Sequence, residues 1–242
     1  MRSADVLLEM GRILLDAAAH YRNEADDLLV IAAPAIVLGP ILVIFASSGL
    51  GGALGTIPAF VLLFLLAHAA CVRAAGLLKS GLRPDPAVAY LDVARRLALV
   101  LRAAAPGALL VAGISAAALV VGDLDYSAPA LGLGVLGALA AFFWGSRHTY
   151  DLPLILIHGL VAEEAARLSE KVTGGNQLWT TFLLALVGAP LLVALLVSWG
   201  LAAVLSPPVG AIVFAAALAL WLPFQALTFA AASDGLFGGA TR

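Results

Sequence analysis

The sequence predicts an all-α integral membrane protein with six transmembrane helices, formed as a single domain over residues 1–242. Three observations predict this fold class. The chain is 63% hydrophobic and only 12% charged, whereas about a quarter of the residues in a soluble domain carry charge. Apolar runs long enough for a bilayer helix recur six times along the chain. The basic residues gather in the segments before, between and after these runs, on one side of the predicted layout.

The six apolar runs are the predicted spans. A transmembrane helix needs about 20 mainly apolar residues, and such runs cover residues 28–48, 54–72, 104–121, 129–146, 178–205 and 207–232. Four prolines inside them should kink the helices without ending the spans: Pro34, Pro40, Pro190 and Pro223. The first run starts too late for a secretory signal, so we expect no cleaved signal peptide.

The basic residues predict the orientation. All 13 fall on one side of the layout: Arg2, Arg12, Arg22, Arg73, Lys79, Arg83, Arg95, Arg96, Arg102, Arg147, Arg167, Lys171 and Arg242. On the other side, the only charges in the short connections are Asp123 and Asp125. Because Lys and Arg in short loops are retained in the cytoplasm, we expect a multi-pass protein of the prokaryotic plasma (inner) membrane with both termini cytoplasmic.

Three charged segments on this side have the pattern of amphipathic interfacial helices. The first has an apolar stripe of Val6, Met10, Ile13, Ala17 and Tyr21. The second should run over 86–102, with Asp85 as its cap, Pro86 as its first residue, and a polar side of Asp92, Arg95, Arg96 and Arg102. The third, over 160–172, has apolar Val161, Ala165, Leu168 and Val172 opposite Glu163, Glu164, Arg167, Glu170 and Lys171. Gly174-Gly175 should end it with a left-handed residue.

The three helices predict an internal repeat. They begin near Asp5, Asp85 and Glu163, at spacings of 80 and 78 residues, and each precedes two apolar runs. The chain therefore reads as three copies of an interfacial helix followed by a helical hairpin, over about 1–78, 79–151 and 152–242.

Two stretches carry a family resemblance. They are HAACVRAAGLLKSGLRPDPAVAYLDVARRLALVLRAAAPG (68–107) and LPLILIHGLVAEEAARLSEKVTGGNQLW (152–179). The chain resembles the YciC-type six-helix prokaryotic membrane proteins, which are similar to the membrane domain fused to some glycerophosphodiester phosphodiesterases. Gly81 to Pro84, Arg95 and Arg96, and then Pro153, Ser169 and Gly174, occupy the matching places. The resemblance implies a role in the envelope or beside transport machinery.

Motifs that could carry chemistry are weak, and we predict no catalytic, cofactor or metal site. Gly132 to Gly137 matches a dinucleotide-binding fingerprint but lies inside an apolar run, where small residues serve helix packing. His148, Asp151 and His158 are too loosely spaced to predict a metal site. Cys71 is the only cysteine and reads as a small buried hydrophobe.

Two polar residues inside the runs are candidates for a function within the membrane. They are His68 and Gln225. Polar groups in lipid usually form hydrogen bonds between helices, and the sharper alternative is that these two line a substrate path.

The function predicted is that of a non-enzymatic membrane protein, an assembly, regulatory or accessory component of an envelope complex. The net charge of −2 provides no basic surface for nucleic acid. The lipid bilayer and a membrane-protein partner are the expected contacts, with Arg95, Arg96, Glu163 and Arg167 as candidate docking residues. The alternative is a permease subunit working with a separate ATPase. A lipid-modifying enzyme using Glu163, Glu164, His148 and His158 is a more distant third.

Overall fold

The computed structural model describes residues 3–46, 50–123 and 127–237, and within these stretches every element is a helix. Ten helices follow one another along the described chain: α1 (Ser3–Asn23), α2 (Ala25–Ala46), α3 (Leu50–Lys79), α4 (Pro86–Arg95), α5 (Leu97–Asp123), α6 (Ser127–His148), α7 (Asp151–Leu156), α8 (Ala162–Gly175), α9 (Gln177–Val204) and α10 (Pro207–Phe237). The predicted all-α class is therefore correct.

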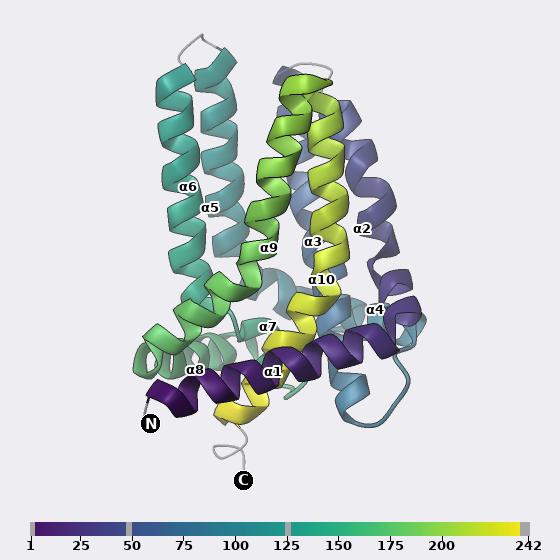
Figure 1. Cartoon of the computed structure of the whole chain (residues 1–242). Coiled ribbons are helices and arrows are strands. Elements are labelled where there is room, and N and C mark those ends of the chain that lie inside the picture. The colour runs from purple at the N-terminus through teal and green to yellow at the C-terminus, as the bar shows by residue number, and fades with distance from the viewer. Residues whose placement is uncertain (1–2, 47–49, 124–126, 238–242) are drawn as a thin grey trace.

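The helices form two layers (Figure 1). The six long helices α2, α3, α5, α6, α9 and α10 stand roughly parallel, and α1, α4, α7 and α8 lie at one end of them. We call these four helices, with the adjoining ends of the long ones, the base. The described chain both begins and ends at the base.

Five of the long helices, α2, α3, α5, α9 and α10, are long and apolar enough to cross a membrane. Their candidate spans are Ala25–Leu42, Leu54–Lys79, Leu97–Ile114, Gln177–Ala202 and Pro208–Ser233. Helix α6 has 22 residues but is not among the five. The four named prolines lie inside continuous helices, as predicted. The sixth span stays a prediction.

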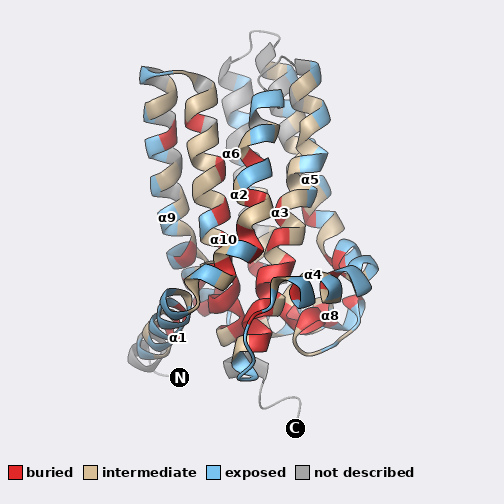
Figure 2. Cartoon of the chain, turned by 90° about the vertical axis from the view of Figure 1, so that its right-hand side faces the viewer, coloured by how far each residue is buried: buried red, intermediate tan, exposed pale blue. Residues whose placement is uncertain are grey.

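The most deeply buried residues lie where the long helices meet the base (Figure 2). On α3 a run of small residues around Cys71, from Ala69 to Ala75, is almost completely inaccessible apart from Arg73. Small side chains let helix backbones approach closely. This packing fixes the base to the long helices, and it confirms that Cys71 is a buried hydrophobe.

Glycines also form the contact between α5 and α6. A Cβ atom on Gly107 would lie 2.3 Å from Trp144, and one on Gly137 would lie 2.5 Å from Ile114. Gly137 is the last glycine of the dinucleotide-like fingerprint, so at this position the motif serves helix packing, as predicted.

The apolar stripe of the first amphipathic helix faces inward. Met10, Ile13 and Ala17 on α1 are buried, and Tyr21 is partly buried. The Tyr21 hydroxyl donates a hydrogen bond to the Leu220 carbonyl of α10 at 3.1 Å. The side chains of Asp5 and Val6 lie outside the described residues.

The second amphipathic helix starts as predicted but ends early. Asp85 accepts a hydrogen bond from the Val88 amide at 3.0 Å, and Pro86 is the first helical residue. Helix α4 ends at Arg95, however, and α5 begins at Leu97. The prediction of one helix over 86–102 is wrong because Arg96 leaves helical geometry, at φ −108° and ψ 14°. Arg102 consequently belongs to α5.

The third amphipathic helix and its end also differ from the prediction. Of the predicted stripe, Ala165 is buried and Leu168 and Val172 pack against the core, but Val161 is exposed. The fully buried face of α8 is formed by Ala162, Ala165, Ser169 and Thr173. The helix runs through Gly174 and Gly175 to Asn176, whose φ is −129°. Neither glycine takes the expected left-handed conformation, which among the described glycines belongs to Gly81 and Gly159.

Candidate functional site: the helical base and its pocket

Polar side chains of α4 hold this helix against the interior of the base. The Arg73 guanidinium of α3 donates to the Asp92 carboxylate at 2.8 Å and to the Leu156 carbonyl of α7 at 3.4 Å. The Tyr90 hydroxyl donates to the Ile31 carbonyl of α2 at 2.7 Å. Burial raises the pKa of Tyr90 to about 12, so this phenol stays a donor at neutral pH. Helix α4 is thereby tied to two neighbouring helices, α3 and α2.

Arg96, a predicted docking residue, has an internal partner. Its guanidinium is partly buried and donates to the Ile155 carbonyl of α7. Two arginines, Arg73 and Arg96, thus bind successive carbonyls at the end of α7. These carbonyls carry the negative end of the helix dipole, and a cation there stabilises the arrangement.

The outward face of α4 is mostly apolar. Val88 and Leu91 are 43% and 51% exposed, and the Arg95 side chain is 69% exposed. These residues are three and four apart, so they share one side of the helix. We call them the α4 stripe. Of the predicted polar side, Arg95 and Arg102 are exposed, whereas Asp92 and Arg96 are partly buried with internal partners, and apolar Val88 and Leu91 are exposed.

Helix α8 is held by hydroxyl groups and by an ion pair. The Ser169 hydroxyl donates to the Arg147 carbonyl of α6 at 2.8 Å, and the Thr173 hydroxyl donates to the same carbonyl at 3.4 Å. Glu163 forms an ion pair with Arg102 of α5 at 2.6 Å. Arg167 is exposed on α8. Of the four predicted docking residues, Arg95 and Arg167 are exposed, and Arg95 also lies 3.4 Å from Asp92 on its own helix. Arg96 and Glu163 contact other helices.

A buried acid and a histidine meet where α6 ends and α7 begins. His148 Nδ1 lies 3.0 Å from Asp151 Oδ2, and His148 Nε2 lies 3.6 Å from Glu170 Oε1 on α8. The hydrogen bond to Asp151 raises the pKa of His148, and burial raises the pKa of Asp151. In the described part of the chain, no three His, Cys, Asp or Glu residues are grouped so as to hold a metal ion.

The two polar residues predicted within the membrane lie on different helices. His68 is on α3, where its Nδ1 atom is buried without a hydrogen-bond partner. Gln225 is on α10 and is partly exposed. Neither lines the pocket of the base.

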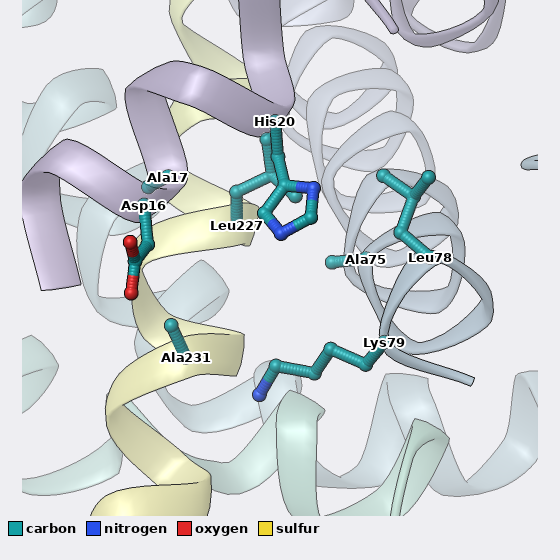
Figure 3. A pocket seen from close by; sticks show the side chains of 8 residues that line it. All are labelled: Asp16, Ala17, His20, Ala75, Leu78, Lys79, Leu227 and Ala231. Atoms are coloured by element: carbon teal, nitrogen blue, oxygen red, sulfur yellow. The ribbon is translucent and has the colours of Figure 1, made fainter. Parts of the chain in front are cut away.

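The pocket lies between α1, α3 and α10 (Figure 3) and has a volume of about 180 Å³. Ala17, Ala75 and Leu227 are its buried lining, whereas Asp16, His20 and Lys79 are exposed at its rim. The other lining residues are Leu78 and Ala231. His20 and Lys79 lie on opposite sides of the opening. The Lys79 ammonium donates to the Ala230 carbonyl of α10.

Sequence reasoning did not find this pocket. The spacing of Asp16 and His20, four residues apart on a predicted helix, places both on one face. Nothing in the sequence, however, indicates that α3 brings Lys79 to that face. Comparison of the chain with protein-family models, curated proteins and solved structures finds no match.

Proposed function

We propose that the chain is a non-enzymatic, multi-pass protein of the prokaryotic plasma membrane and that its base is a cytoplasmic docking platform. In this proposal α6 is the sixth span. Its 22 residues extend about 33 Å at roughly 1.5 Å per residue, so the predicted span of 129–146 fits a bilayer hydrocarbon core of about 30 Å and leaves Arg147 and His148 beyond it. The order of the elements, in which α1, α4 and α8 each precede two long helices, supports the proposed three repeats.

The α4 stripe is the observation that carries the docking role. An interfacial helix usually buries its apolar residues and exposes its polar ones. On α4 the polar residues Tyr90, Asp92 and the adjoining Arg96 are used for internal bonds, which leaves Val88 and Leu91 exposed. Because these internal bonds hold α4 in place, the helix needs no reordering when a partner binds, and this lowers the entropic cost of association.

The stripe also defines the chemistry of the partner. Val88 and Leu91 provide an apolar contact, and Arg95 provides a positive charge beside it. The complementary surface is an apolar helix face that carries an acidic residue, on the cytoplasmic side of another membrane component. The proposed role is therefore assembly with, or regulation of, such a component.

Site-specific crosslinking tests this role. A photoreactive amino acid is placed at Leu91 in cells, and the adducts are identified by mass spectrometry. The matched control position is Leu109, an exposed leucine within α5. We expect one stoichiometric protein adduct from position 91 and lipid adducts from position 109. Lipid adducts alone from both positions would refute the docking role.

A permease subunit that works with a separate ATPase is the second candidate. It is favoured by the place of α4, which follows α3 directly, continues into α5, and is tied to α3 by the Arg73–Asp92 ion pair. A displacement of α4 by a bound partner would therefore be transmitted to both α3 and α5. If the crosslinked partner is an ATPase, Arg95→Glu should lower the ATPase stimulation and Arg12→Glu on α1 should not. Equal stimulation with both variants would exclude this candidate.

A further inference from the structure

The pocket between α1, α3 and α10 lies at a defined depth relative to the long helices. Lys79 is the last residue of α3 and also the last residue of its candidate span. Basic side chains at the end of a span extend to the lipid headgroups. If α3 crosses the membrane as proposed above, the rim of the pocket lies at headgroup depth.

The size of the pocket limits its occupant. Pockets for drug-sized ligands measure roughly 300–1,000 Å³, and this one measures about 180 Å³. Its buried lining is formed by apolar Ala17, Ala75 and Leu227. The space therefore fits a small group with a short apolar segment, such as the two methylene groups between a phosphate and an amine.

The rim of the pocket contains both hydrogen-bond donors for an anion and a carboxylate for a cation. Lys79 provides an ammonium, which has three N–H donors, and its bond to the Ala230 carbonyl positions this ammonium beside the pocket. His20 provides a ring nitrogen, a donor in one tautomer or when protonated. Asp16, one helical turn before His20, provides a carboxylate on the α1 side. A ligand that satisfies this rim has both an anionic and a cationic group.

We infer that the pocket binds a phosphoethanolamine group, as the headgroup of a phospholipid in the cytoplasmic leaflet. The phosphate oxygens accept from Lys79 and His20, and the primary ammonium donates to the Asp16 carboxylate. The methylene groups between them lie against the alanines. A phosphatidylglycerol headgroup has no cation for Asp16, and the trimethylammonium of phosphatidylcholine has no N–H to donate, so the site distinguishes these lipids.

Native mass spectrometry of the full chain in mild detergent tests the inference. The protein is titrated separately with phosphatidylethanolamine, phosphatidylglycerol and phosphatidylcholine of identical acyl chains. We expect one saturable phosphatidylethanolamine site. Asp16→Asn should weaken its binding about tenfold, as expected for the loss of one charge-assisted hydrogen bond, and should leave phosphatidylglycerol binding unchanged. Lys79→Gln should weaken the binding of both lipids.

Matched variants separate a specific effect from a general one. Asp26→Asn and Lys171→Gln change exposed charges outside the pocket and should retain wild-type binding. Lys79→Arg keeps the positive charge and should retain most of the binding. This result would attribute the loss in Lys79→Gln to the missing charge and not to misfolding. Helical content is measured by circular dichroism for every variant.

Three results would overturn the inference. Equal binding of the three lipids by the wild type would show that no headgroup is selected. Unchanged phosphatidylethanolamine binding by Asp16→Asn would show that the selection lies elsewhere. Competition by soluble phosphoethanolamine at the same concentration as the lipid would identify a soluble ligand instead. None of these results depends on a protein partner, so the docking role can fail while the lipid site stands, and the reverse.

Discussion

Individual side chains at the base show how burial determines the contribution of an ion pair to stability. Two ion pairs have the same length of 2.8 Å: Arg73–Asp92, with side chains 26% and 21% exposed, and Arg12–Glu9, at 69% and 36%. Water and salt screen the second pair strongly and the first one less. Equal geometry therefore does not imply equal stabilisation.

Removing the arginine from each pair should reveal this difference. Arg73→Gln leaves the Asp92 carboxylate partly buried with its main partner lost, and should lower the free energy of unfolding by about 1–3 kcal/mol. Arg12→Gln should lower it by less than about 1 kcal/mol. The measurement is reversible unfolding in mixed detergent micelles, followed by circular dichroism. Equal losses for the two variants would contradict this account of burial.

The pair of His148 and Asp151 should make stability depend on pH. The hydrogen bond to Asp151 raises the pKa of His148 above its ordinary value of 6.5 in the folded protein. The resulting stabilisation is fully present below pH 6.5 and is lost as the pH rises through the raised value. One proton limits the slope to about 1.4 kcal/mol per pH unit.

This prediction is checked by unfolding the wild type and Asp151→Asn between pH 6 and pH 9. The wild type should lose stability with rising pH, and the variant, which lacks the main cause of the shift, should lose less over the same range. A wild-type profile that is flat across this range would contradict the assigned pair.

At the scale of elements, the sequence predicts where helices begin better than which way they face. Asp85 and Pro86 start α4 as expected because capping depends on adjacent residues only. The direction of Asp92 and Arg96 depends on Arg73 and on the Ile155 carbonyl, which are distant in the sequence. The amphipathic pattern identifies residues that share a side, and tertiary contacts decide whether that side is buried.

The glycines of α5 provide a matched test of helix packing in the α5–α6 hairpin. Gly107 has Trp144 where its Cβ would lie, and Trp144 is itself stacked on His148 at 4.7 Å, whereas Gly113 has no atom within 4 Å. Gly107→Ala should destabilise the protein by about 1–3 kcal/mol through overpacking. Gly113→Ala should be neutral or stabilising, by up to about 1 kcal/mol. Thermal unfolding measures both, and a stabilising Gly107→Ala would contradict the close contact.

At the scale of the whole molecule, the predicted all-α class agrees with the observed fold. Composition and the long apolar runs are properties of the whole chain, so the class does not depend on which residues meet in the folded structure. The pocket could not be predicted, since it needs α1, α3 and α10 to meet. The α4 stripe could not be predicted either, because an exposed apolar side resembles a buried one in the sequence. Six spans and a cytoplasmic base are the central claim that joins these features.

Cysteine labelling in intact cells tests this claim most directly. In a Cys71→Ala background, single cysteines replace Leu205, at the end of the long helices opposite the base, Leu82, between α3 and α4, and Glu164 on α8. A membrane-impermeant thiol reagent should label position 205 at once, and positions 82 and 164 only after the membrane is permeabilised. Labelling of position 164 in intact cells, with position 82 protected, would mean that α6 does not cross the membrane and would contradict the account.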